Sequence, residues 1–165
     1  MPDVACAQNI EWFRVLLPSA IAVLSAFLSG YFFARYKSRE DQIDKRCDEL
    51  CVEISSVGNA SSLYWLSAST PPIETNIQHA KIVAGWSRIS GLRVLLEDFI
   101  SETAKDELLE AEMKMFGVTT GSNFGGVNIV AEPQRARECI LEAAHYVNDV
   151  RTARMRDTKG HLRRR

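Results

Sequence analysis

The chain has 165 residues, of which 46% are hydrophobic and 25% are charged, and its net charge at pH 7 is −1. Beyond one long apolar segment, residues 38–165 are enough for one domain with its own core. The net charge identifies no class of partner, because it hides a strongly basic C-terminal segment.

Residues 15–34 form an apolar segment without a charged side chain. As a helix, such a segment is about as long as the hydrocarbon core of a bilayer is thick, ~30 Å. Its Leu, Ile, Val and Phe side chains each favour insertion by roughly 0.3–0.6 kcal/mol, which outweighs the penalties of Pro18 and the small polar residues. The sequence therefore predicts one transmembrane helix and a lipid bilayer as the first partner.

The charges beside this segment predict its orientation. Arg14 is the only basic residue before it, whereas five basic residues follow it closely: Arg35, Lys37, Arg39, Lys45 and Arg46. Because basic flanks stay in the cytoplasm, we expect residues 1–14 outside and the C-terminal domain inside a bacterial inner membrane. A cleaved signal peptide is the alternative, although its basic residues would precede the apolar run. Cleavage would also leave an odd number of cysteines in an oxidising compartment.

Apolar residues recur with helical spacing along the rest of the chain, which predicts an all-α domain of about four helices over residues 38–158. The first helix carries a heptad seam and ends before Pro71; the seam consists of Ile43, Cys47, Leu50, Ile54 and Val57. Pro72 begins a second helix, whose apolar stripe is Ile73, Ile77, Trp86, Ile89, Leu92, Leu96, Phe99 and Ile100. Gly85 and Gly91 are weak points of that helix or sites of close packing.

A third helix is expected over residues 103–116, with Gly117 as its C-terminal cap and with an inward face of Leu108, Leu109, Met113 and Phe116. Residues 117–128 are then a glycine-rich loop, and Pro133 begins a fourth helix. The apolar residues of this last helix are Ile140, Leu141, Ala144, Val147 and Val150. It merges into a basic tail, residues 159–165.

Small residues gather on one face of the transmembrane segment: Ala22, Ser25, Ala26, Ser29 and Gly30. Such a face lets two helix backbones approach closely and lets hydroxyl groups bond between them. We therefore expect a homo-oligomer with this face as its interface.

The loop and the start of the fourth helix contain the parts of an anion site. Backbone amides of glycines, a helix N-terminus, Arg135 and Arg137 are suited to a phosphate. The loop lacks the Gly-Lys-Ser/Thr of a nucleotide-hydrolysing P-loop, and a plain connector is the favoured interpretation.

Four side chains have the chemistry of zinc ligands. Cys47 and Cys51 lie one helical turn apart, and Cys139 and His145 lie on the fourth helix. Cysteines on an apolar seam are more often small core residues, so we expect neither a metal nor a cofactor.

Arg156 and His161 are separated by a short polar run, Asp-Thr-Lys-Gly. This spacing resembles the signature of the HEPN superfamily of helical-bundle ribonucleases. The resemblance implies that His161 would act as general acid or base and that Arg156 would stabilise charge on the phosphate. We expect Gly160 to interrupt the helix here, and a basic tail without catalytic activity is the favoured interpretation.

The order of one membrane helix, a helical cytosolic bundle and a basic tail is similar to that of small membrane-embedded accessory proteins of type VI CRISPR systems. The resemblance implies an oligomeric single-pass inner-membrane effector of bacterial stress or anti-phage defence that forms a pore and has no enzymatic activity. Two alternatives remain. One is a membrane-tethered adaptor whose basic tail binds RNA or an acidic protein, and the other is a HEPN-type ribonuclease.

Overall fold

The computed structural model describes the backbone of residues 4–67, 72–121, 123–126 and 130–163, and the side chains of residues 17–67, 74–121, 123–126 and 130–156. The described residues form four helices and no strand: α1 (Val4–Leu66), α2 (Pro72–Glu97), α3 (Glu102–Thr120) and α4 (Pro133–Arg163). The prediction of an all-α chain is therefore confirmed. The chain divides into two compact units, residues 1–42 and residues 43–165.

The first unit contains the N-terminal part of α1. This helix is long and apolar enough to cross a membrane, and no part of its most apolar stretch is buried in the protein. Its large side chains are openly exposed, with exposed fractions of 70% for Val23, 69% for Phe27 and 69% for Phe33. The helix therefore has an apolar surface that the rest of the described chain does not cover.

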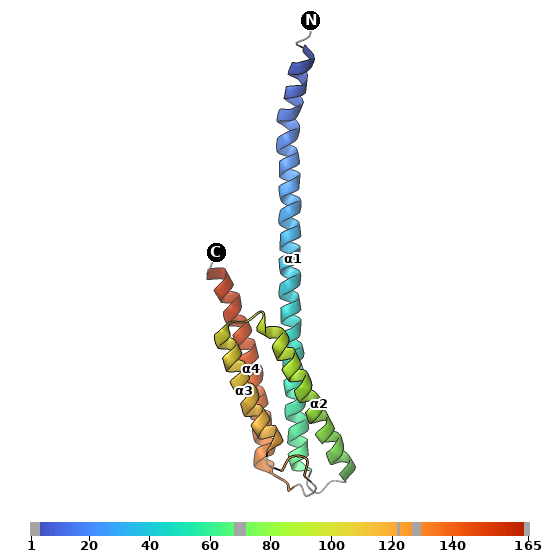
Figure 1. Cartoon of the computed structure of the whole chain (residues 1–165), viewed down its shortest axis with the longest axis vertical. Coiled ribbons are helices and arrows are strands. Elements are labelled where there is room, and N and C mark those ends of the chain that lie inside the picture. The colour runs from blue at the N-terminus through green and yellow to red at the C-terminus, as the bar shows by residue number, and fades with distance from the viewer. Residues whose placement is uncertain (1–3, 68–71, 122, 127–129, 164–165) are drawn as a thin grey trace. The chain divides into compact units, whose positions relative to one another are not determined.

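The second unit is an up-and-down four-helix bundle made of residues 43–66 of α1 and the helices α2, α3 and α4. Consecutive helices of the bundle run in opposite directions (Figure 1). The heptad seam of α1 is confirmed, because all five of its residues are buried: Ile43, Cys47, Leu50, Ile54 and Val57. The bundle therefore has a continuous core of its own, to which all four helices contribute.

Two glycines let α1 approach its neighbours closely. A Cβ atom added to Gly58 of α1 would lie 2.6 Å from the Cβ atom of Ala143 on α4. A Cβ atom added to Gly85 of α2 would collide with the side chain of Val57. Gly85 is thus a close-packing site, whereas a Cβ atom at Gly91 would meet no atom within 4 Å.

The starts of α2 at Pro72 and of α4 at Pro133 are confirmed, but the predicted end of the third helix is wrong. Helix α3 continues through Gly117 to Thr120, and its C-cap is Gly121, which has a positive φ of 37°. The extra turn is held by tertiary contacts, because Thr119 is fully buried among the helices. The loop therefore begins four residues later than the glycine at position 117 suggests.

The predicted inward face of α3 is also wrong in part. Leu108 is buried, but Leu109, Met113 and Phe116 have exposed fractions of 41%, 59% and 50%. The buried face of the helix is instead lined by mostly smaller residues: Ala104, Leu108, Ala111, Met115 and Thr119. Helix α3 has two apolar faces, and it packs on α4 through the one with the alanines, which permit a short distance between helices.

Four further expectations need correction. Ile77 of α2 and Ile140, Leu141 and Ala144 of α4 are exposed, and α2 ends at Glu97, before Phe99 and Ile100. The predicted interruption at Gly160 is wrong, because α4 continues to Arg163. A glycine costs a helix only about 1 kcal/mol relative to alanine, which the rest of a long helix can offset.

Candidate functional site

The small-residue face of α1 lies entirely on exposed side chains of the first unit: Ala22, Ser25, Ala26, Ser29 and Gly30. The hydroxyl group of Ser25 donates to the carbonyl of Ala22 at 2.9 Å, and that of Ser29 donates to the carbonyl of Ser25 at 2.7 Å. Both hydroxyls are thereby satisfied within the helix, as an apolar surrounding requires. A Cβ atom at Gly30 would meet nothing within 4 Å, so this face has room for a second helix.

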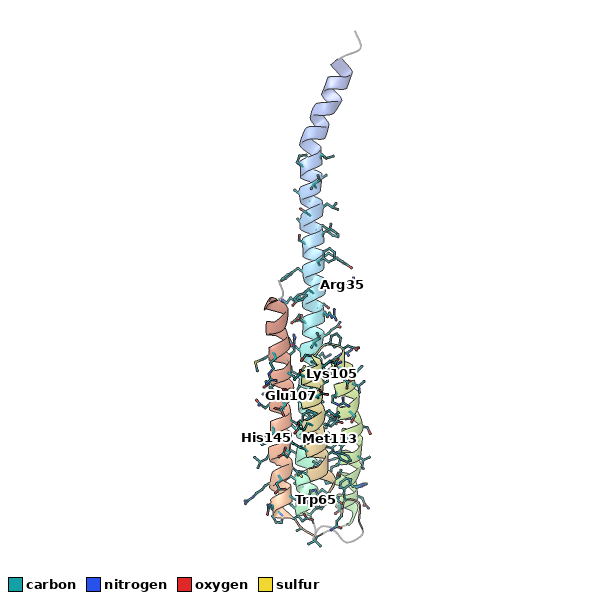
Figure 2. All side chains as sticks on the ribbon, turned by 60° about the vertical axis from the view of Figure 1, so that its left-hand side comes forward. Arg35, Trp65, Lys105, Glu107, Met113 and His145 are labelled. Carbon is teal, nitrogen blue, oxygen red and sulfur yellow. The ribbon has the colours of Figure 1, made fainter. Side chains whose placement is uncertain are left out.

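The two arginines of the predicted anion site are not brought together. The Nε atom of Arg135 donates to the carboxylate of Glu132 at 2.6 Å, and its guanidinium lies over the indole of Trp65, 4.7 Å from the ring centroid. Arg137 is exposed two residues further along α4, which places it on a different side of the helix. The charge of Arg135 is therefore balanced by a carboxylate at the end of the bundle where Trp65 lies (Figure 2).

The described part of the loop after α3 is held against the same end of the bundle. Its Gly125 N–H donates to the hydroxyl of Tyr64 at 2.9 Å. The ring of Phe124 lies 4.6 Å from that of His79 and 5.1 Å from that of Tyr64, between centroids. The backbone N–H of Gly125 thus holds the loop against Tyr64 and is not directed at an anion. Residues 122, 127 and 128 of the predicted loop lie outside the described residues.

The predicted zinc ligands do not form a cluster. Among the described side chains, no three of His, Cys, Asp and Glu lie close enough to hold a metal ion. Burial raises the pKa of the Cys47 thiol to about 11 and that of the Cys139 thiol to about 12, which opposes the thiolate form that binds zinc. His145 is exposed beside Glu142, with 3.8 Å between its Nδ1 atom and the carboxylate. The cysteines therefore act as core residues in the described part of the bundle.

Arg156 of the HEPN-like motif is engaged in an ion pair. Its Nη1 atom donates to both carboxylate oxygens of Glu107 on α3, at 2.9 and 2.7 Å. The pair lies in a groove of about 400 Å³ between α3 and α4, which also contains Glu142, Asp149 and the ion pair of Glu110 with Lys114. The side chain of His161 lies outside the described side chains. Carboxylates around Arg156 oppose the approach of a phosphate to this arginine.

A second groove, between α2 and α3, has a volume of about 550 Å³ and was not predicted from the sequence. It contains the three α3 side chains that the periodicity placed in the core: Leu109, Met113 and Phe116. From α2 it is lined by Trp86, whose ring packs edge-on against that of Phe116 at 5.2 Å between centroids. Figure 2 marks Met113 on α3. The feature of the sequence that could have predicted this groove is the second apolar stripe of α3, which contains Leu109, Met113 and Phe116.

Among the described residues that line this groove, the only charged one is Glu112, and it is neutralised from within the bundle. Its carboxylate accepts hydrogen bonds from the hydroxyl of Ser90, at 2.7 Å, and from the guanidinium of Arg93. Arg93 also forms an ion pair with Glu97. The side chains of Arg93 and Glu112 are only 16% and 12% exposed. The described lining is therefore an apolar surface with a neutralised carboxylate at its edge.

No protein-family model matches the sequence, and neither a curated protein nor a solved structure is significantly similar to it.

Proposed function

We propose that the protein is a single-pass protein of the bacterial inner membrane that assembles with copies of itself, and that its cytoplasmic bundle is an interaction module without catalytic activity. The observation that carries the proposal is the exposed apolar stretch of α1, in a chain whose bundle has a core of its own. Burial of a Val or Phe side chain contributes about 1.5–3 kcal/mol, so a stretch of such residues favours transfer into lipid.

The small-residue face of α1 supports assembly within the bilayer. Lipid chains are as apolar as leucine, so helices associate there mainly through close packing, which small residues permit. Ala22, Ala26 and Gly30 are spaced four residues apart, and the hydroxyls of Ser25 and Ser29 are already satisfied. This face can therefore meet a second helix without leaving a hydroxyl group unpaired.

Two arginines just before the basic tail give little support to an adaptor for RNA, because carboxylates of the bundle hold them. Arg154 pairs with Asp44 at 2.6 Å, and Arg156 pairs with Glu107. A pore-forming effector of stress or anti-phage defence is the specific form of this proposal that the layout resemblance implies. In that form, overproduction of the intact chain collapses the membrane potential, and overproduction of a variant that cannot assemble does not.

The assembly is tested with the double variant Ala26→Leu/Gly30→Leu in the full chain. Leucine side chains on this face keep the helix backbones apart, which costs on the order of 1 kcal/mol at each of the two positions. The control is Ala20→Leu, because 100° per residue places Ala20 on a different side of the helix from Ala22, Ala26 and Gly30. Light scattering of the detergent-solubilised proteins should give a smaller particle for the first variant only. Equal particle masses for both variants would mean that this face is not the assembly interface.

The orientation is tested separately with a C-terminal alkaline phosphatase fusion, which is active only outside the cytoplasm. The basic residues after the apolar segment, from Arg35 to Arg46, predict an inactive fusion. A fusion to a fluorescent protein that matures in the cytoplasm is the positive control. An active phosphatase would mean that the C-terminal domain lies outside the cytoplasm, which is the opposite of the proposed topology.

A further inference from the structure

We propose that the groove between α2 and α3 is the docking surface for a second copy of the bundle, so that two bundles pair face to face about a two-fold axis. This interface would be separate from the small-residue face of α1. The inference deepens the proposed function and rests on it in one respect, namely that membrane anchoring gives both copies the same orientation.

The surface has the composition of the core of a protein interface. Aromatic residues and methionine are enriched in such cores and charged residues are depleted. The groove presents Met113 and Phe116 beside the largely buried ring of Trp86, while the carboxylate of Glu112 is paired with Arg93. Exposed Val83 and Val94 lie on the same side of α2 as the groove-lining Ser87 and Ser90. In a chain with 25% charged residues, an apolar face of this kind indicates a binding surface.

The surface is also complementary to itself. Leu109, Met113 and Phe116 are spaced i, i+4 and i+7, which is the spacing of anchor residues on a helix that enters an apolar groove. The groove that such a ridge would fill lies beside it, between α2 and α3. A two-fold axis lets each copy insert its ridge into the groove of the other, as an isologous interface requires.

Charge and space favour a second copy over other occupants. A polyanion would meet no cation among the described residues that line this groove, and their one charged side chain, Glu112, is already paired with Arg93, whereas a second copy presents an equally apolar face. Cβ atoms added at Gly91 of α2 or at Gly117 of α3 would meet nothing within 4 Å. Gly117 lines the groove, so it leaves room there for the close approach of another helix.

Membrane anchoring makes a symmetric contact of this face geometrically accessible. Copies inserted by the same segment share one orientation and one depth, so their symmetry axis is parallel to the membrane normal. Equivalent faces of two copies then lie at the same height. No inversion of a protomer is needed for the ridge and groove to pair.

Cysteine cross-linking of the full chain in membranes tests the interface. Leu109, Met113 and Phe116 are replaced singly by cysteine in a background with Cys6→Ser, and the control is Leu141→Cys on α4. The native cysteines at positions 47, 51 and 139 are buried, so they do not compete for the oxidant. The ridge residue nearest the two-fold axis should yield a covalent dimer under mild oxidation, and the control should not. Absence of a dimer from all three ridge positions, or equal yield from the control, would overturn the proposal.

A charge substitution tests the same interface without a new bond. Met113→Glu and the control Leu141→Glu introduce the same charge at positions of similar exposure, 59% and 56%. Burial of an unpaired carboxylate in the groove should weaken association about tenfold or more, as measured by light scattering in detergent, whereas the control should not. Far-ultraviolet circular dichroism confirms that both variants are folded.

These variants also separate the two proposals. If Met113→Glu leaves the particle mass unchanged while Ala26→Leu/Gly30→Leu lowers it, the docking surface is wrong and the proposed function stands. If only Met113→Glu lowers the mass, the bundle pairs and the face on α1 plays no part in assembly.

Discussion

The indole N–H of Trp86 donates a hydrogen bond of 3.1 Å to the hydroxyl group of Thr119, inside the bundle. The carbonyl oxygen of Thr119 accepts a second hydrogen bond, from the indole N–H of Trp65, at 3.0 Å. Thr119 thereby connects α3 with α1 and α2, next to the wall that Trp86 gives the α2–α3 groove. This residue explains why α3 continues past Gly117, and it supports the surface proposed to bind a second copy.

Replacement of Thr119 by valine should lower the free energy of unfolding by about 1–3 kcal/mol, because the buried indole of Trp86 would be left without its acceptor. The control is Thr120→Val, since the hydroxyl of Thr120 donates to the carbonyl of Phe116 near the surface, at 2.7 Å. That change should stay within about 0.5 kcal/mol. Urea denaturation followed by tryptophan fluorescence measures both. Equal effects would mean that the buried bond contributes nothing.

The two glycines of α2 should respond in opposite directions to alanine. Gly85→Ala should destabilise the bundle by about 1–3 kcal/mol, because the new Cβ atom collides with the buried, β-branched side chain of Val57. Gly91→Ala should stabilise it by up to about 1 kcal/mol, since nothing lies within 4 Å and alanine favours the helix. Thermal unfolding of the two single variants gives the comparison. A stabilised Gly85→Ala variant would contradict the close approach of α1 and α2.

Stability should fall as the pH rises above about 9. Burial raises the pKa of Cys47 to about 11 and that of Cys139 to about 12, from an ordinary value of 9.0. Between these values the unfolded chain releases thiol protons that the folded chain retains, so each thiol removes up to about 1.4 kcal/mol of stability per pH unit. Denaturation at a series of pH values should give a shallower decline for Cys139→Ala than for the parent. An identical slope would mean that Cys139 is accessible to solvent when folded.

Arg156→Ala and His161→Ala should leave assembly and any cellular phenotype unchanged. The ion pair of Arg156 with Glu107 is exposed, so its removal should cost less than about 1 kcal/mol. A ribonuclease of the HEPN type would need both side chains. The purified full chain is therefore incubated with single-stranded RNA beside the two variants. Cleavage by the parent and its absence in both variants would replace the proposed function with an enzymatic one.

The sequence predicts the helices well because their apolar spacing and their prolines are local signals. The seam from Ile43 to Val57 and the starts at Pro72 and Pro133 needed no tertiary information. The end of α3 did, because Gly117 is a good cap by itself and only the contacts of Thr119 extend the helix. The outward face of α3 was missed for a similar reason. Periodicity shows that Leu109, Met113 and Phe116 share a stripe, but it does not show whether that stripe meets the core or another molecule.

The proposed function requires that residues 15–34 hold the intact chain in the membrane. The most direct test is the intact mass of the protein recovered from membranes washed at alkaline pH, which releases peripheral proteins. We expect a membrane-retained species of about 18.5 kDa that still contains the apolar segment. A shorter species that lacks this segment and is recovered in the wash would contradict it, because it would identify the segment as a cleaved signal peptide.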